Sequence, residues 1–108
     1  MYDKPYYIYI IECDNNRYYT GIKTDVYRRF NEHKYKKNGA KFTKSYKPKR
    51  ILLVYKTDSK SNALKLEYNI KKLKKMQKIE IINNKRMFKY YFDNILDVKK
   101  YKKINILF

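Results

Sequence analysis

The order of the elements predicted from the sequence indicates a small α/β sandwich, in which helices flank a three-stranded, mainly antiparallel sheet. Three observations predict this class. β-branched and aromatic residues fill two neighbouring segments near the N-terminus, a short apolar run follows in mid-chain, and helix-like periodicity flanks that run. The resulting order is β-β-α-β-α-α, and 108 residues are enough for one domain but too few for two.

The first two strands form a predicted hairpin. Residues 6–12 (YYIYIIE) and 18–22 (YYTGI) have the composition of strands, and residues 13–17 (CDNNR) between them supply Asp and Asn, which tolerate the positive φ of a tight turn. The run RILLVYK at 50–56 has strand length and predicts the central strand of the sheet.

Three helices are predicted between and after these strands. Asp25 is a good N-cap for a helix that reaches about Tyr35, and a loop containing Gly39 follows it. The second helix is expected to end near Leu73, and the third to cover residues 75–84. Three residues are alternative N-caps of the second helix: Asp58, Ser59 and Ser61.

Residues 85–108 are interpreted as a C-terminal extension of a domain that covers residues 1–84. Residues 87–99 are compatible with a helix that carries aromatic residues on one face, and residues 104–108 (INILF) with a short strand or a frayed end. We expect the extension to pack on the same domain.

The chain carries a formal charge of +18, of which residues 1–84 contribute +13, so the excess is not confined to a detachable arm. A field of this sign attracts polyanions, and nucleic acid is the commonest polyanion inside cells. A compositional bias towards Lys, Ile, Asn and Tyr is the alternative, with Lys filling solvated positions. Charge alone does not distinguish a protein that cuts its partner from one that carries it.

The expected location is intracellular, in the cytoplasm or nucleoid, or in the nucleus of a eukaryotic or viral system. The single Cys13 cannot form an internal disulfide, which suits a reducing compartment. No apolar run approaches the roughly 20 residues of a membrane span. The chain does not open with a basic-then-apolar leader, and we expect no membrane partner.

Arg29 and His33 lie four residues apart and therefore side by side on the first predicted helix. Val26 and Phe30 define the buried stripe of that helix, so the pair occupies its margin, where a polar group can face a cleft. In the structural alternative, Arg29 stacks on a tyrosine and His33 satisfies a loop carbonyl.

Glu67 lies at the edge of the apolar stripe of the second predicted helix, among many lysines. A carboxylate in a basic surface makes sense if a hard divalent cation joins it to a phosphate. The alternative is an ordinary ion pair between Glu67 and Lys71, which stabilises a helix by about 0.2–0.5 kcal/mol.

Alternation along the hairpin predicts that Tyr9 and Tyr19 share a face with Gly21. Glycine there would let a helix or a phosphate approach the backbone closely. A phenol is a poor base at neutral pH, but cationic neighbours make its proton easier to remove. With 14 tyrosines in the chain, ordinary packing is the alternative for both residues.

These residues together resemble the GIY-YIG nuclease domain. The resemblance rests on YIY at 7–9, YTG at 19–21, Arg29, His33 and Glu67, in that order along the chain. It covers about residues 5–80 and is greatest for the small stand-alone members and for the catalytic subunit of the structure-selective endonucleases. Tyr7 and Thr20 depart from the Gly and Ile of the two motifs, as in the stand-alone branch.

The resemblance implies hydrolysis of a nucleic-acid phosphodiester with one divalent metal ion, Mg²⁺ or Mn²⁺, held by Glu67. It implies that Tyr9, Tyr19 or His33 assists the attacking water and that Arg29 stabilises the charge on the phosphate. Some relatives carry Lys after the second motif, where this chain has Ile22. Resemblance and charge together give the expected nucleic-acid contacts: Gly21, Lys23, Lys41, Lys44, Lys71 and Lys72.

The preferred hypothesis is therefore a metal-dependent DNA endonuclease of low sequence specificity, with a role in DNA repair or recombination, and selectivity for DNA structure is left open. Two alternatives stay open. One is a non-catalytic, basic nucleic-acid-binding protein that uses its lysines and tyrosines for backbone contact and stacking. The other is an inactive GIY-YIG fold that serves as a partner module.

Overall fold

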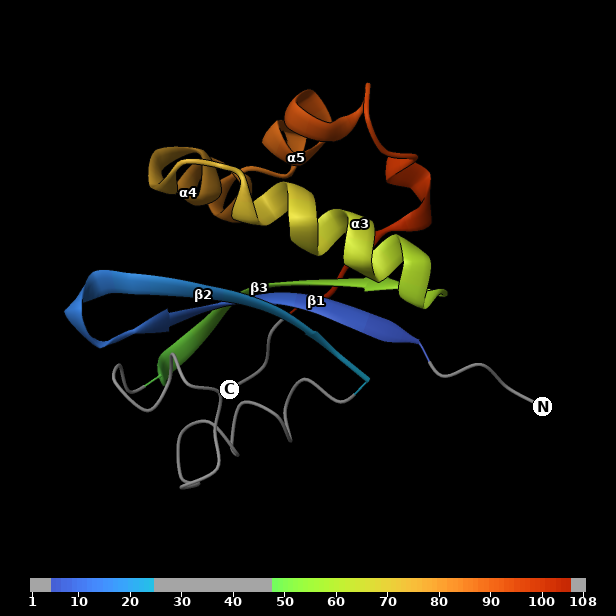
Figure 1. Cartoon of the computed structure of the whole chain (residues 1–108). Coiled ribbons are helices and arrows are strands. Elements are labelled where there is room, and N and C mark those ends of the chain that lie inside the picture. The colour runs from blue at the N-terminus through green and yellow to red at the C-terminus, as the bar shows by residue number, and fades with distance from the viewer. Residues whose placement is uncertain (1–4, 25–47, 106–108) are drawn as a thin grey trace.

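The computed structural model describes residues 5–24 and 48–105, which form a four-stranded sheet with helices on one side (Figure 1). The sheet order is β2-β1-β3-β4, and all pairings are antiparallel. The strands are β1 (Tyr6–Cys13), β2 (Arg17–Lys23), β3 (Pro48–Thr57) and β4 (Lys102–Lys103). The helices are α3 (Lys60–Lys71), α4 (Lys75–Asn83) and α5 (Lys85–Phe92), with short 3₁₀ segments η1 (Asp14–Asn16) and η2 (Val98–Lys100).

The predicted α/β class is confirmed, whereas the predicted number of strands is wrong. β4 adds a fourth strand by pairing with Tyr55 and Lys56 of β3, and the amide of Ile104 then donates to the carbonyl of Val54 at 2.9 Å. Two lysines have no apolar pattern that could predict a strand. Their conformation depends on the edge of β3, which lies far away in the sequence.

The hairpin between β1 and β2 forms as its composition predicts. Asn15 and Asn16 both adopt the left-handed conformation, with φ of 63° and 62°. These are residues that tolerate positive φ better than most, so the turn follows from local chemistry. The predicted first helix after Asp25 lies outside the described residues.

A β-bulge changes which side chains of β3 face the helices. Ile10 pairs with Leu53 but Ile11 pairs with Ile51, so Leu52 is an extra residue in the strand. Leu53 consequently packs against the helices, while Ile51 and Val54 pack on the opposite face. A single strand thus serves two apolar clusters whose residues do not alternate strictly.

α3 begins after Ser59, one of the three predicted caps, and buries an apolar stripe. The Ser59 side chain accepts a hydrogen bond from the amide of Asn62 at 3.1 Å, and Ala63, Leu66 and Ile70 are fully buried. The helix ends at Lys71, two residues before the expected end, because Lys72 forms its C-cap.

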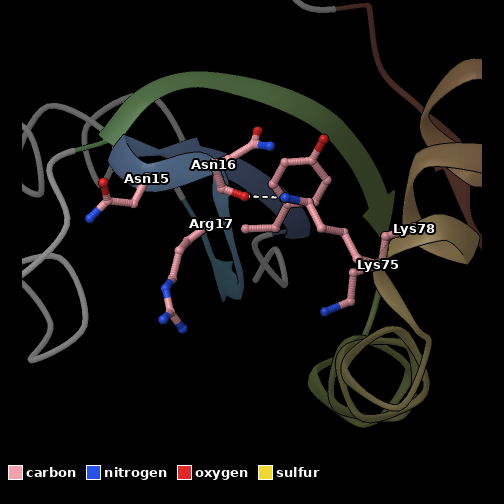
Figure 2. A pocket seen from close by; sticks show the side chains of 6 residues that line it. Asn15, Asn16, Arg17, Lys75 and Lys78 are labelled. Atoms are coloured by element: carbon pink, nitrogen blue, oxygen red, sulfur yellow. Dashed lines mark hydrogen bonds between the residues drawn. The ribbon is translucent and has the colours of Figure 1, made fainter.

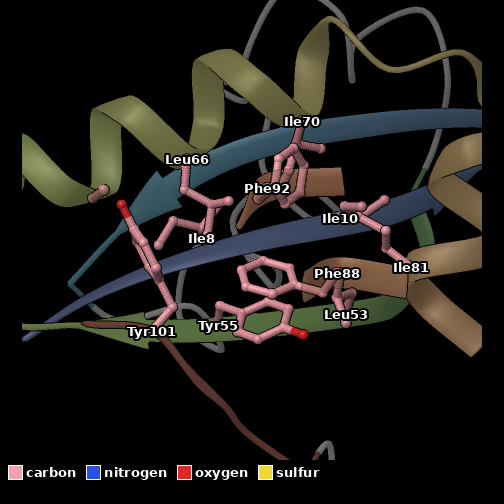
Figure 3. Close-up of a cluster of buried hydrophobic side chains, with 11 residues drawn as sticks. Ile8, Ile10, Leu53, Tyr55, Leu66, Ile70, Ile81, Phe88, Phe92 and Tyr101 are labelled. Atoms are coloured by element: carbon pink, nitrogen blue, oxygen red, sulfur yellow. The ribbon is translucent and has the colours of Figure 1, made fainter. Parts of the chain in front are cut away.

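The C-terminal part of the chain contributes side chains to the larger apolar cluster. α5 begins at Lys85, where the Asn84 side chain caps the amide of Arg86, and ends at Phe92, well before the expected residue 99. Phe88 stacks on Tyr55 with ring centroids 4.1 Å apart, and Tyr101 contacts Phe88 edge-on (Figure 3). Among the described helices, none is both long and apolar enough to cross a membrane.

Candidate functional site

Two phenols meet on the face of the sheet opposite the helices. In the register of the hairpin, Tyr9 is directly opposite Gly21, and Tyr19 is opposite Ile11. The rings of Tyr9 and Tyr19 are tilted by 41° with their centroids 6.3 Å apart. Tyr9 is almost completely buried, whereas Tyr19 is half-buried and is the more accessible of the two.

Gly21 is required by its contact with these rings. A Cβ atom on Gly21 would lie 2.8 Å from Tyr9 Oη, which is closer than real Cβ atoms approach their neighbours, and 3.1 Å from Tyr19 Cε2, which is a tight contact. The space over Gly21 is therefore filled by the Tyr9 phenol. The glycine permits the two tyrosines to converge, and the close approach of a helix or a phosphate to this backbone stays a prediction.

Lys23 lies on the same face as this tyrosine pair. It is half-buried at the end of β2 and pairs with Tyr7 of β1. Its side chain therefore places a positive charge beside the tyrosine face of the hairpin.

Glu67 lies on the other side of the sheet, on the helix that packs over Ile8 and Ile10. Its carboxylate forms an i,i+4 ion pair with Lys71, with a distance of 3.4 Å between Oε2 and Nζ. The structural alternative considered for Glu67 is thus present in the fold.

The three glutamates in the described ranges differ in how firmly they are held. Glu12 accepts a hydrogen bond from Arg50 Nε at 2.7 Å, and Glu80 accepts one from the hydroxyl of Tyr91. Glu67 has only the longer contact with the exposed, flexible Lys71 among the interactions described. Of these three carboxylates, Glu67 is therefore the easiest to redirect towards a cation.

Within the described residues, no group of three or more His, Cys, Asp or Glu side chains could form a complete metal-ligand set. Mg²⁺ does not need one, since it usually binds one or two carboxylates and completes its coordination with water and substrate phosphate. The chemistry of Glu67, a single partly buried carboxylate among lysines, fits a metal of this kind.

A basic cleft of about 410 Å³ lies where the hairpin turn meets α4 (Figure 2). Lys75 reaches from α4, donates a hydrogen bond to the carbonyl of Asn16, and lies 4.8 Å from the centre of the Tyr18 ring. This contact fixes the turn against the helix. The lining residues are Asn15, Asn16, Arg17, Tyr18, Lys75 and Lys78.

Lys78 of the basic cleft lies close enough to Lys71, the partner of Glu67, for the two charges to repel each other. Burial and the neighbouring charge of Lys71 lower the pKa of Lys78, so the Lys71 that pairs with Glu67 also repels a lysine of the cleft. A phosphate between these lysines would relieve the repulsion.

The basic cleft was not predicted from the sequence. Its lining residues Arg17, Tyr18, Lys75 and Lys78 were not among the predicted site residues. The only local signal is the spacing of Lys75 and Lys78, three apart on one helix face. Their encounter with the hairpin turn is a tertiary contact that no local pattern encodes.

The remaining predicted residues are divided between exposed and undescribed positions. Lys71 and Lys72 are exposed at the end of α3, and Lys72 lies 5.0 Å from the centre of the Tyr68 ring. Four predicted site residues lie outside the described residues: Arg29, His33, Lys41 and Lys44.

Comparison with known proteins identifies the family of the chain. Residues 5–80, which make up more than half of the chain, match the GIY-YIG catalytic domain. The chain therefore belongs to the GIY-YIG family, a family of endonucleases.

Within that family the chain belongs to a group of small proteins called UPF0213. It is 51% identical over 76 residues to a UPF0213 protein of Cupriavidus necator, covering 70% of this chain and 82% of that protein. A UPF0213 protein of Fusobacterium nucleatum is 40% identical over 94 residues, which cover 87% of this chain and 93% of the relative. The solution NMR structure of a UPF0213 protein from Bacillus halodurans is 35% identical, with a TM-score of 0.48, and covers 73% of this chain and 83% of that one.

Proposed function

We propose that this protein is a metal-dependent endonuclease that hydrolyses DNA phosphodiester bonds with low sequence specificity, in DNA repair or recombination. The observation that carries the proposal is the convergence of Tyr9 and Tyr19 over Gly21 in a chain of the GIY-YIG family. A fold that needed only packing at this point could use any apolar side chains.

The two tyrosines divide the work according to their burial. Tyr19, the more accessible, positions the attacking water and takes up its proton while passing its own hydroxyl proton to the solvent, and the buried Tyr9 holds the Tyr19 ring in place. His33 is an alternative proton acceptor. Arg29 binds the scissile phosphate and stabilises the charge that develops on it, which is usually the largest contribution in such reactions.

Glu67 is the residue that would hold the divalent cation, Mg²⁺ or Mn²⁺. When bound, the cation supplies charge neutralisation and polarisation at the phosphate. The 3.4 Å contact with Lys71 is weak enough for Glu67 to exchange it for a cation, and Lys71 is then available for a phosphate.

The basic cleft supports a nucleic-acid substrate. Arg17, Lys75 and Lys78 surround a hollow next to Lys71, and the chain carries a charge of +18. Such a surface binds backbone phosphates without reading base sequence, which is the reason to propose low sequence specificity. Lys23, Lys41, Lys44 and Lys72 add charge to the same partner in this proposal.

A non-catalytic nucleic-acid-binding protein is the second candidate function. It is favoured by the exposed Tyr68 and Tyr90, which are 63% and 75% exposed and could stack on bases. It would need the charge and the exposed rings, but not the tight packing of Tyr9 and Tyr19 against Gly21.

Cleavage of labelled duplex, single-stranded and branched DNA, with Mg²⁺, Mn²⁺ or EDTA, separates the two candidates. The wild type is expected to cut with either metal and not in EDTA, and Glu67→Gln to lose roughly a hundredfold or more in rate. Asn69→Asp in the Glu67→Gln background is the control. It returns a carboxylate to the same helix, two residues away and pointing in another direction, so it should not restore cutting.

DNA binding is measured together with cleavage, so that loss of cleavage can be distinguished from loss of binding. Wild-type protein that binds DNA but never cuts it would support the non-catalytic candidate. Glu67→Gln that cuts as fast as wild type would remove the metal assignment. The slope of affinity against salt concentration counts the phosphates contacted, and Lys75→Gln is expected to reduce that slope by about one.

A further inference from the structure

We propose that a second cavity, formed by β3, α5 and η2, binds one nucleotide of the substrate, with the base inside and the phosphate at the rim. The cavity has a volume of about 500 Å³, within the range of about 300–1,000 Å³ typical of ligand pockets. It rests on the proposed function only in taking nucleic acid as the substrate. The lining residues are Tyr55, Asn84, Lys85, Arg86, Phe88, Lys89, Val98 and Tyr101.

The body of this nucleotide cavity is apolar and aromatic. Phe88 lies against Tyr55 with an interplanar angle of 20°, and the Tyr101 ring contacts Phe88 at 6.2 Å and 69° (Figure 3). Together with Val98, these rings give the cavity an apolar lining. A nucleobase is planar and aromatic, so its shape and surface suit the lining.

The Tyr55 hydroxyl supplies a polar group that the protein leaves unused. Tyr55 is only 1% exposed, and its oxygen has no hydrogen-bond partner within residues 5–24 and 48–105. By contrast, the hydroxyl of Tyr101 points towards α3 and donates to the carbonyl of Asn62 at 2.7 Å (Figure 3). Buried hydroxyls are normally paired, so the Tyr55 oxygen indicates a missing partner.

A base edge matches what this hydroxyl can offer. Burial raises the pKa of Tyr55 to about 12, so the group keeps its proton near neutral pH and can both donate and accept a hydrogen bond. The edges of nucleobases carry donors and acceptors side by side. A purely aliphatic ligand would leave the hydroxyl unpaired.

The rim of the nucleotide cavity is positively charged. Lys85, Arg86 and Lys89 all come from α5, and the described lining includes no carboxylate to neutralise them. A guanidinium and two ammonium groups at the mouth of an apolar cavity suit a ligand with an apolar body and an anionic end. A nucleotide has this combination, whereas an apolar peptide would leave the cations without a partner.

A neighbouring hollow gives the strand a place to continue. Arg86 and Lys89 also line a depression of about 430 Å³ with Tyr90, Asp93 and Asn94. The ring of Tyr90 is 75% exposed, as expected of a platform on which the next base can stack. Most of the lining of both hollows lies beyond residue 80, where the match to the catalytic domain ends.

The test is an amide NMR titration of the full chain, in EDTA, with thymidine 5′-monophosphate, thymidine or inorganic phosphate. The monophosphate is expected to shift the amides of residues 84–89 and 98–101 saturably. Thymidine and inorganic phosphate should each require about tenfold higher concentration or more, because each lacks one half of the recognition.

Two variants and one matched control locate the interaction. Arg86→Gln with Lys89→Gln is expected to weaken monophosphate binding about tenfold, and Tyr55→Phe to weaken it about threefold without loss of the fold. Lys60→Gln with Lys65→Gln removes the same charge from the exposed surface of α3 and should change affinity less than about twofold.

Three results would overturn the proposal. Inorganic phosphate that binds as tightly as the monophosphate would leave an anion site without base recognition. Shifts at these amides that depend on protein concentration alone would assign the cavity to a second copy of the chain. Monophosphate binding equal in the rim variant and the control would place the ligand elsewhere.

Failure of this proposal is distinguishable from failure of the endonuclease proposal. Monophosphate binding in EDTA involves no cleavage, so the expected titration together with inactive wild-type protein would reject only the endonuclease. Active wild-type protein with none of the expected shifts would reject only the nucleotide cavity.

Discussion

The two faces of the sheet use similar apolar and aromatic residues, but they pack against different partners. The face under the helices packs Ile8, Ile10 and Leu53 against apolar side chains from α3, α4 and α5. The opposite face gathers Tyr9 and Tyr19 around a glycine. On the helix-covered face, aromatic rings fill the space between the sheet and the helices. On the opposite face, Gly21 has no side chain, and this lets the two phenols approach each other.

The faces also differ in their buried hydroxyl groups. Thr20, Tyr55 and Thr57 hold buried side-chain oxygens without a hydrogen-bond partner in the described part of the chain, and their register places all three on the helix-covered face. A core that served stability alone would use valine or phenylalanine there. The helix-covered face therefore carries unused polar capacity, and one such group borders the nucleotide cavity.

The largest expected effect comes from opening the helix-covered core. Phe92 is 1% exposed and packs edge-on against Phe88 with centroids 5.2 Å apart. Phe92→Ala should lower the free energy of unfolding by about 3–5 kcal/mol, measured by urea denaturation. Tyr90→Ala, on the exposed side of the same helix, should change it by less than about 0.5 kcal/mol. Equal effects would mean that α5 does not belong to the core.

Gly21→Ala is the corresponding test of the opposite face. The new methyl group would collide with the Tyr9 hydroxyl, so we expect a loss of about 1–3 kcal/mol and a fall in DNA cleavage. Because Gly21 does not have positive φ, backbone strain does not contribute. Tyr9→Phe in the Gly21→Ala background should recover part of the stability, and additive losses would contradict the contact.

Two tyrosine-to-phenylalanine changes should have opposite signs. Tyr55→Phe removes an unpaired buried hydroxyl, so it should leave stability unchanged or raise it by about 1 kcal/mol. Tyr101→Phe removes the hydrogen bond to the Asn62 carbonyl and should cost about 0.5–1.5 kcal/mol. Thermal and urea denaturation of both variants compares them directly. A destabilised Tyr55→Phe would mean that the hydroxyl has a partner.

Alkaline pH is expected to weaken the fold gradually. Burial raises the pKa of Tyr55 from 10.0 to about 12, so the folded state holds this proton more tightly than the unfolded state. The associated stability is complete below pH 10 and is lost as pH rises from 10 towards 12. The free energy of unfolding should decline less steeply in Tyr55→Phe over this window, and identical slopes would exclude Tyr55 as a cause.

Local chemistry made much of the fold predictable from sequence. Turn formation at Asn15 and Asn16, the Ser59 cap and the two faces of β1 each depend on residues a few positions apart. The convergence of Tyr9 and Tyr19 was predictable for the same reason, since alternation along two short strands fixes it.

The features that sequence did not predict depend on distant contacts. The bulge at Leu52 shifts the pattern of β3 by one residue, β4 forms only against the edge of that strand, and Lys75 meets Asn16 across the molecule. The close contact of the Tyr9 hydroxyl with position 21 was not predicted, because it depends on a side chain from the neighbouring strand. The periodicity of a sequence predicts which face of a strand or helix a side chain lies on, but it does not predict which residues of other elements contact that side chain.

Cys13 gives the protein an internal reporter of local opening. It is fully buried at the end of β1 on the tyrosine face, and burial, with Asp14 and Glu12 nearby, raises its pKa to about 11. Alkylating reagents attack only an accessible thiolate, so the closed state is protected twice. The labelling rate of this one native thiol therefore measures how often the tyrosine face opens, and a tightly bound substrate that closes this face would slow it.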